Sequence, residues 1–244
     1  MPKAAIPTEH EGLPVATSAF MRELDRLAAE QGLDAAVLMD KAGKAVAEGV
    51  LEFLKGTLGV APAGATVAVA AGRGANGGDG LVAARYLKEN GVDAAVFMIP
   101  PKADGVYPAP VERALALAKE SGVQVEPFSN GSEAFVRTLD RSTAVLDALL
   151  GTGATGKPAG PAHRMIQAIT RSKKPVIALD VPSGLDPDTG YHSGVFIAAS
   201  LTLTIGLAKR GLLAPHAKRC VGELKVLDIG YPPELVKRLA AGFR

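Results

Sequence analysis

From residue 66 onward, short runs of strand-forming residues alternate with longer runs at helical spacing. This alternation limits the possible folds more than any other feature of the sequence, because consecutive parallel strands need a helix-length connection between them. The strand-like runs are almost wholly apolar, which is typical of strands that helices cover on both faces. The pattern therefore predicts an α/β fold, a three-layer Rossmann-like sandwich with a mostly parallel central sheet.

The elements can be bounded from their periodicity and their flanking Gly and Pro residues. Strands are expected at residues 66–71, 94–99, 123–128, 144–150, 175–180, 201–205 and 223–229. Helices are expected at residues 80–90, 110–121, 132–141, 162–172 and from residue 233. The strand at 201–205 has an alternative, because residues 195–207 could also form a buried helix.

Two further helices are expected before the first strand. Ser18 can cap a helix over residues 18–31, and residues 34–54 continue the helical spacing. No linker is long enough to divide the chain, so we expect residues 1–244 to form a single domain, with residues 1–17 as a flexible arm.

The composition argues against several classes of protein. The 244 residues carry a formal net charge of +2 without an isolated basic run, so no nucleic-acid partner is expected. A single cysteine, Cys220, allows no internal disulfide and fits a reducing compartment. We see neither a secretory signal nor the roughly 20 apolar residues that a membrane helix needs. We expect a cytoplasmic protein without a membrane partner.

A glycine-rich segment, residues 72–80, directly follows the first predicted strand. Glycines let the backbone approach an anion closely, and free N–H groups at a helix start point toward it. The segment matches G-x-G-x-x-G, but the next strand ends in Ile99 and Pro100 without the acid that dinucleotide sites usually have there. Hydride transfer with NAD is therefore disfavoured, and a tight strand–helix turn without a ligand is the alternative.

A second glycine-rich segment, residues 151–157, follows the strand at 144–150. It matches G-x-x-x-x-G-K, the phosphate-binding half of a P-loop, but Pro158 replaces the Ser or Thr that would hold magnesium. We interpret it as a phosphate-binding loop without a metal ligand, with a flexible connection as the alternative.

A third motif begins with Asp180, at the end of a predicted apolar strand, and includes Ser183. An Asp at the rim of a sheet is partly desolvated, and its pKa can rise toward the range that general acid–base catalysis uses. The four His residues are scattered without the spacing of metal ligands.

These motifs, in this order, resemble the NAD(P)H-hydrate epimerase family, whose fold is the YjeF N-terminal domain. The family's G-P-G-N-N-G-G-D-G-L-V-A-A-R is matched by residues 72–85, and its D-x-P-S-G-L-x-x-D-T-G by residues 180–190. An Asp followed by G-T-G is matched by Asp147 and residues 151–153. The sequences L-M-E-N-A-G and T-x-G-x-x-K are similar to residues 38–43 and 204–209.

The resemblance implies epimerisation of the R and S forms of hydrated NADH and NADPH, in the repair of nicotinamide nucleotides. It implies one K+ per subunit, held by Asn76, Asp147 and Ser183, and a homodimer; Asp180 is our candidate for catalytic proton transfer. Because the chain is too short to include a dehydratase domain, functional coupling to a separate NAD(P)H-hydrate dehydratase is expected. The implied substrate contacts are Ala75, Asn76, Gly77, Gly78, Asp79, Gly151, Thr152, Gly153, Ala154, Thr155, Gly156, Lys157 and Asp180.

Two departures from the family pattern keep other functions open. Ala75 replaces an Asn, and Asp40-Lys41 replaces Glu-Asn, which adds a cation near the expected pocket mouth. The alternatives are a non-catalytic nucleotide-binding or scaffold protein of the same fold, and a phosphotransferase based on residues 151–157. For the epimerase, we expect Asp180→Asn to nearly abolish activity with little loss of stability.

Overall fold

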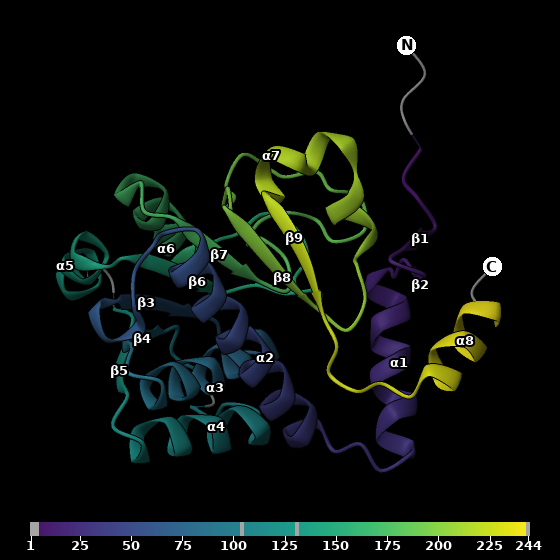
Figure 1. Cartoon of the computed structure of the whole chain (residues 1–244), viewed down its shortest axis with the longest axis horizontal. Helices are drawn as coiled ribbons and strands as arrows, with labels where there is room; N and C mark the ends of the chain where they lie inside the picture. The colour runs from purple at the N-terminus through teal and green to yellow at the C-terminus, as the bar shows by residue number, and fades with distance from the viewer. Residues whose placement is uncertain (1–4, 103–104, 130–131, 243–244) are drawn as a thin grey trace.

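The central sheet of the molecule contains seven parallel strands in the order β5-β4-β3-β6-β7-β8-β9, with helices on both faces (Figure 1). The computed structural model describes residues 5–102, 105–129 and 132–242. The predicted α/β sandwich is confirmed. The strands of this sheet are β3 (Thr66–Ala71), β4 (Asp93–Met98), β5 (Gln124–Pro127), β6 (Ala144–Ala148), β7 (Val176–Leu179), β8 (Leu201–Ile205) and β9 (Glu223–Leu227).

The helices connect these strands and also precede and follow the sheet along the chain. Short 3-10 turns occur at Pro62–Gly64, Arg210–Leu213 and Pro215–Ala217. The α-helices are α1 (Ser18–Glu30), α2 (Ala35–Gly56), α3 (Ala75–Glu89), α4 (Ala109–Glu120), α5 (Glu133–Arg141), α6 (Gly160–Ser172), α7 (Lys218–Val221) and α8 (Pro233–Gly242).

The strands are apolar on both faces because each face has its own helical layer. In β3, Val67 and Val69 pack into the cluster formed with α2, α3 and α4, whereas Ala68 and Ala70 face α5 and α6. Residues 201–205 form the strand β8, which is fully buried, and not the alternative buried helix. A strand that helices enclose on both faces has no polar side to show, which explains why its sequence resembled a buried helix.

Helices α2 and α3 pack unusually closely at one glycine. A Cβ on Gly43 would lie 2.4 Å from the Cβ of Val82, so a larger residue would force the two helices apart. This close contact fixes α3, whose first turn lies directly after β3. Packing therefore accounts for the Gly in the L-M-E-N-A-G-like motif.

Helices α1 and α8 lie side by side at one end of the molecule (Figure 1). Thr17, and not Ser18 as predicted, caps α1 through its side-chain oxygen, which accepts a hydrogen bond from the backbone N–H of Phe20. The backbone N–H of Ser18 instead donates to Asp188 Oδ1 over 2.6 Å, so Asp188 anchors the start of α1.

The segment before α1 also differs from the expected flexible arm over its described part. Residues 5–17 include a small antiparallel pair, β1 (Glu9–His10) and β2 (Leu13–Pro14). Ala16 is fully buried and pairs with Lys209 in a parallel bridge. Residues 1–4 lie outside the described residues.

Candidate active site

A cavity of about 850 Å³ lies at the carboxyl ends of β3, β6 and β7. From β3 the chain builds β4 and β5 on one side, and then returns to place β6 on the other side. Loops that follow β3 and β6 therefore diverge, and this switch point is where open α/β sheets bind ligands. The volume lies within the range of roughly 300–1,000 Å³ that is usual for small-molecule sites.

The first glycine-rich segment contributes to the cavity through the start of α3. The helix begins at Ala75, and not near residue 80 as predicted, so six of the nine residues of the expected loop are helical. Ala75, Asn76 and Asp79 line the cavity, whereas Gly77 and Gly78 do not.

The two enclosed glycines serve close packing. A Cβ on Gly77 would lie 1.9 Å from the carbonyl oxygen of Gly72, and one on Gly78 would lie 2.5 Å from Cε of Met39. Their substrate contacts stay a prediction. The fold itself leaves no room for a side chain at either position.

The second glycine-rich segment lines the cavity over its full length, from Gly151 to Lys157. Gly156 has φ +78°, a left-handed conformation that glycine adopts without steric cost. As expected, Pro158 delays the next helix, and α6 begins only at Gly160. Two more cations, Arg73 and Lys102, also line the cavity, so three basic side chains are available for an anionic ligand.

Asp180 lies at the cavity wall, directly after β7, and is paired with a buried lysine. Its Oδ1 lies 2.5 Å from Nζ of Lys209, which also donates to the carbonyl oxygen of Ile205 over 2.5 Å. The Lys209 side chain is 1% exposed, so this ion pair is almost completely shielded from water. Lys209 is the last residue of the T-x-G-x-x-K-like motif, but the motif alone does not indicate a role for it.

The second carboxylate oxygen of Asp180 remains directed to the glycine-rich segment after β6. The backbone N–H of Thr152 donates to Oδ2 over 3.2 Å. Asp180 itself has φ +69°, an uncommon conformation for a non-glycine residue. Such backbone strain costs roughly 1–3 kcal/mol and is concentrated at functional sites.

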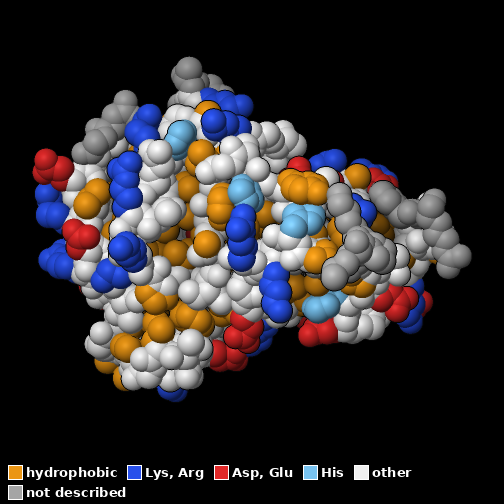
Figure 2. Space-filling model, turned by 90° about the horizontal axis from the view of Figure 1, so that it is seen from above, with side chains coloured by type: hydrophobic (Ala, Val, Ile, Leu, Met, Phe, Trp, Pro, Cys, Tyr) orange, Lys and Arg blue, Asp and Glu red, His pale blue; other side chains and the backbone are white. Residues whose placement is uncertain are grey.

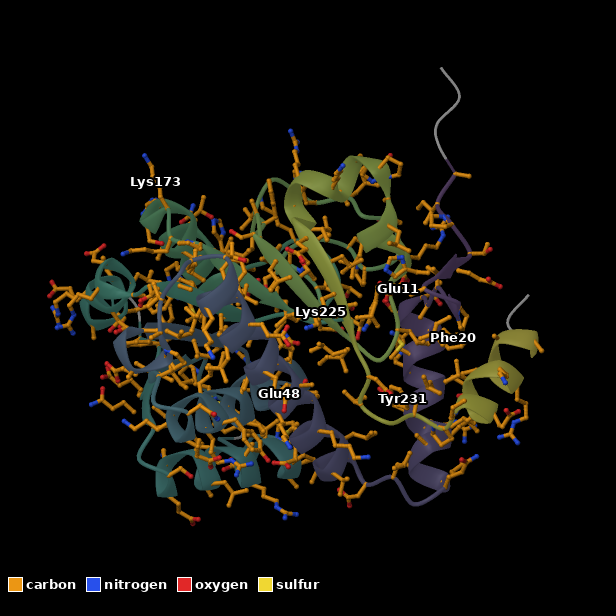
Figure 3. All side chains as sticks on the ribbon, viewed as in Figure 1. Glu11, Phe20, Glu48, Lys173, Lys225 and Tyr231 are labelled. Atoms are coloured by element: carbon orange, nitrogen blue, oxygen red, sulfur yellow. The ribbon has the colours of Figure 1, made fainter. Side chains whose placement is uncertain are left out.

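Two further acidic residues, Asp79 and Asp25, interact electrostatically with the same lysine, and Tyr231 binds Asp25. Burial raises the pKa of Asp79 well above its ordinary value, and the nearby Asp180 and Asp25 carboxylates add to this effect while Lys209 opposes it. Asp25 comes from α1, and its Oδ1 accepts a hydrogen bond from the Tyr231 hydroxyl over 2.5 Å. Tyr231 lies beside α1 in Figure 3. All five side chains line the cavity.

Asp25 and Tyr231 could not be identified from the sequence. They are 206 residues apart and meet only when α1 packs against the segment between β9 and α8. Loss of solvent raises the pKa of Asp25, and burial likewise raises the pKa of the Tyr231 phenol. No motif in α1 marked Asp25 as a cavity residue.

The three predicted potassium ligands are divided between the cavity and the interior. Asp147 and Ser183 are buried and bound to each other, with Ser183 Oγ donating to Asp147 Oδ1 over 2.7 Å. The backbone N–H of Ser183 donates to Asp147 Oδ2 over 2.8 Å, and that of Leu149 to Oδ1 over 3.3 Å. Burial raises the pKa of Asp147 to about 6, although these hydrogen bonds oppose the shift.

Asn76 is the third predicted ligand, and it lines the cavity. Its side-chain Nδ2 is enclosed and has no hydrogen-bond partner among the residues described. Its oxygen lies close to Gly151, where an added Cβ would come within 3.1 Å of it.

The departures at residues 40 and 41 lie outside the cavity wall. Asp40 accepts hydrogen bonds from Arg85 over 2.5 Å and from the Tyr86 hydroxyl over 3.1 Å, so it connects α2 to α3. Lys41 is exposed and does not line the cavity; its Nζ lies close to Gly230. Because Ile229 and Tyr231 on either side of Gly230 line the cavity, the Lys41 ammonium lies near the rim, and its effect on the pocket mouth stays a prediction.

Two kinds of feature are absent from the described residues. Among the described residues, no group of three or more His, Cys, Asp or Glu side chains could hold a metal ion. In the same part of the chain, no helix has both the length and the apolar character to cross a membrane.

A family model and full-length relatives both match this chain over most of its length. The family model described as "YjeF-related protein N-terminus" matches residues 35–211. An NAD(P)H-hydrate epimerase of Elusimicrobium minutum is 38% identical, and the match covers 91% of this chain and 98% of that protein. A bifunctional NAD(P)H-hydrate repair enzyme Nnr of Pyrobaculum aerophilum is 39% identical over 89% of this chain, which spans 42% of the enzyme's length.

A crystal structure of the yeast protein ynu0 has the same fold. It superposes with a TM-score of 0.78 over 93% of each chain, at 24% sequence identity.

Proposed function

The chain belongs to the family of YjeF-related protein N-termini, and we infer that it is an NAD(P)H-hydrate epimerase. It interconverts the R and S forms of hydrated NADH and NADPH. The observation that carries this inference is the end-to-end match to a relative with that name, combined with a shielded acid in a cavity lined by glycine-rich loops. No residue at the end of β4 supplies the acid of a usual dinucleotide site, which agrees with a reaction without net redox change.

The cavity supplies what this isomerisation needs. In the hydrate, the hydroxyl is bonded to a ring carbon beside nitrogen, so the nitrogen lone pair can help to expel water once a proton is donated. Water can then add to the opposite face of the flat cationic intermediate. We propose that Asp180 takes part in this proton transfer, and that the segment Gly151–Lys157 with the start of α3 binds the diphosphate.

We also propose one bound K+ per subunit, held by Asn76, Asp147 and Ser183. The three side chains offer only oxygen donors, which suit a hard monovalent cation, and Asp147 would supply the charge. The enclosed Nδ2 of Asn76 has no acceptor among the described residues, and turning the amide over would present its oxygen, the atom that can bind a cation, at that position. Asp147 already binds Ser183, so two of the three groups are held together before any ion arrives. The ion would supply a fixed positive charge beside the loops that bind the ligand.

The bifunctional relatives support functional coupling to a dehydratase. Because such relatives join repair activities in one chain, we propose that this protein acts together with an NAD(P)H-hydrate dehydratase. A homodimer and a cytoplasmic location are further proposals, which rest on the family resemblance and on a buried free cysteine, Cys220. Light scattering of the purified protein tests the dimer directly.

A non-catalytic nucleotide-binding protein is the second candidate function. It is favoured by Ala75, which lies at the first residue of α3 and lines the cavity with a methyl group where the family has an amide. A phosphotransferase is disfavoured, because Pro158 follows the P-loop-like segment and α6 starts three residues after Lys157.

One experiment separates the two candidates. Purified R hydrate is incubated with the protein, and the appearance of the S hydrate is followed by chromatography under conditions where spontaneous epimerisation is slow. An epimerase accelerates the interconversion in both directions towards the same equilibrium ratio. If the rate equals that of the buffer while the hydrate still binds, the epimerase function is wrong.

A further inference from the structure

Asp180 has a partner that restricts what it can do in catalysis. The Lys209 ammonium contacts Oδ1 at 2.5 Å in a site almost without water, and an ammonium in such a site stabilises the carboxylate form. Lys209 is also held in place by the backbone, because Ala16 N–H donates to Ala208 and Arg210 N–H donates to Ala16. Asp180 is therefore organised as a proton acceptor.

The cluster has too few cations for all its acids. Asp25, Asp79 and Asp180 interact electrostatically with Lys209, and no other cation within the described residues contributes to the charges around Asp79. Tyr231, a further polar neighbour, donates a hydrogen bond from its hydroxyl to Asp25 Oδ1. Asp79 and Asp180 are buried whereas Asp25 is exposed, and one ammonium cannot balance two buried carboxylates, so one of these two acids retains its proton.

Asp79 is the acid whose surroundings favour the neutral form. It is 8% exposed, it lines the cavity, and it shares the low-water region with the Asp180–Lys209 pair. Across the part of the chain that is described, no donor reaches its carboxyl group, and its interactions with Asp180, Asp25 and Lys209 are electrostatic only. Its carboxyl group reaches the cavity, where a ligand or a water molecule can complete its hydrogen bonds.

We propose that Asp79 is a second catalytic residue, which donates the proton to the departing hydroxyl while Asp180, held as a carboxylate by Lys209, accepts the proton from the incoming water. This inference rests on the epimerase function proposed above. It assigns the two halves of the proton transfer to two residues, because neighbouring carboxyl groups in different environments can act as an acid and a base at one pH.

The step balances in atoms and electrons. The bond between the ring carbon and the hydroxyl oxygen breaks, its electron pair leaves with oxygen, and the Asp79 proton completes a water molecule. The ring nitrogen lone pair forms a double bond to the carbon. Water then bonds to the opposite face, its proton passes to Asp180, and the nitrogen lone pair is restored. Exchange with solvent returns the proton to Asp79, and the reverse epimerisation uses the two groups in exchanged roles.

The test compares three variants in the R-to-S assay. Asp79→Asn keeps the size and polarity of the side chain but has no acidic proton, so kcat should fall by about 100-fold or more, as is typical when a general acid is lost. KM should stay within about threefold of the wild-type value, because the loss of a group that acts only in the transition state lowers kcat and leaves substrate binding unchanged. Asp79→Glu should retain at least about tenfold more activity than Asp79→Asn. The control, Asp93→Asn, changes an exposed acid at the start of β4.

A second measurement covers the case in which Asp79→Asn is poorly folded. Added formic acid should raise the rate of Asp79→Ala in proportion to its concentration, because a small acid can enter the vacated site. Asp180→Ala lacks the proton acceptor and not the donor, so its rate should depend on the formic acid concentration in a different way. Retention of kcat in Asp79→Asn, or a rise in KM alone, would overturn the role of Asp79. A wild-type protein without epimerisation would instead overturn the proposed function.

Discussion

Asp147 lies in β6, and Asp180 directly follows the neighbouring strand β7. Both are buried, but they contact different kinds of partner. Asp147 accepts three hydrogen bonds, two from Ser183 and one from the Leu149 backbone. Asp180 Oδ1 contacts Lys209 and accepts from the Ile205 backbone, while Oδ2 accepts from the Thr152 backbone and the side chain lines the cavity. A carboxylate whose lone pairs are occupied by backbone and hydroxyl donors holds two loops together. One that keeps an oxygen at a cavity wall is available for chemistry.

The largest expected effect concerns the Asp180 side of this comparison. Asp180→Asn should lower kcat by about 100- to 10,000-fold, because the amide cannot accept the proton. The expectation of little stability loss must be corrected, since the change leaves Lys209 buried without its partner, which usually costs about 3–5 kcal/mol. Unfolding in urea measures the stability loss.

A double variant separates the two consequences of that change. Asp180→Asn combined with Lys209→Met removes both charges and should recover most of the lost stability without any recovery of activity. Wild-type turnover in either variant would contradict the assignment of Asp180.

For Asp147 we expect a substitution to lower the free energy of unfolding, and not to remove the group that transfers a proton. Asp147→Ala removes the acceptor of two buried donors of Ser183, and each unsatisfied donor costs about 1–3 kcal/mol, so the free energy of unfolding should fall by about 2–6 kcal/mol. Ser183→Ala should cost less, because the backbone bond to Asp147 remains. If Asp147→Ala unfolds at the wild-type urea concentration, the carboxylate has no structural role.

Potassium sharpens the comparison further. KCl should raise the melting temperature above that in choline chloride at the same ionic strength. At a K+ concentration of 100 times the dissociation constant, binding should add about 2.7 kcal/mol to the free energy of unfolding. Asp147→Ala should remove the difference between the salts, whereas Asp180→Asn should keep it. Equal melting temperatures of the wild-type protein in the two salts would remove the ion from this site.

The smallest expected effect is at Ala75, on the cavity wall next to Asn76. Ala75→Asn adds one donor and one acceptor, and a net hydrogen bond contributes about 0.5–1.5 kcal/mol. We expect kcat/KM to rise by about 2- to 12-fold, measured with the hydrate mixture when the spontaneous reaction is slow. A flat or lower value would show that the missing amide does not limit this enzyme.

Much of the fold could be predicted from the sequence because its signals are local. The central strands, including β3 and β6, show as apolar runs, and the glycine-rich segments after them mark the edge where the cavity lies. Asp180 could be identified because it ends such a run. The start of α3 was misplaced because glycine is a poor helix former in isolation. Here the close contacts of Gly77 and Gly78 decide the local structure instead.

The partners of Asp180 could not be predicted, since they depend on contacts between distant segments. Lys209 follows β8, Asp25 belongs to α1, and Tyr231 follows β9, so their meeting point depends on how three elements pack. A sequence pattern shows which residues share an element, but it does not show which elements share a cavity.

The anchoring of α1 has a consequence for the order in which the molecule is assembled during synthesis. Ser18 is bound by Asp188, 170 residues later, and Asp25 by Tyr231, 206 residues later. Helix α1 therefore cannot complete these contacts until residues 188 and 231 have been synthesised. Such long-range contacts form late, because the intervening chain must be ordered first. A chain that ends before β9 lacks Ile229 and Tyr231, which line the cavity, so such a truncated product should have no epimerase activity at all.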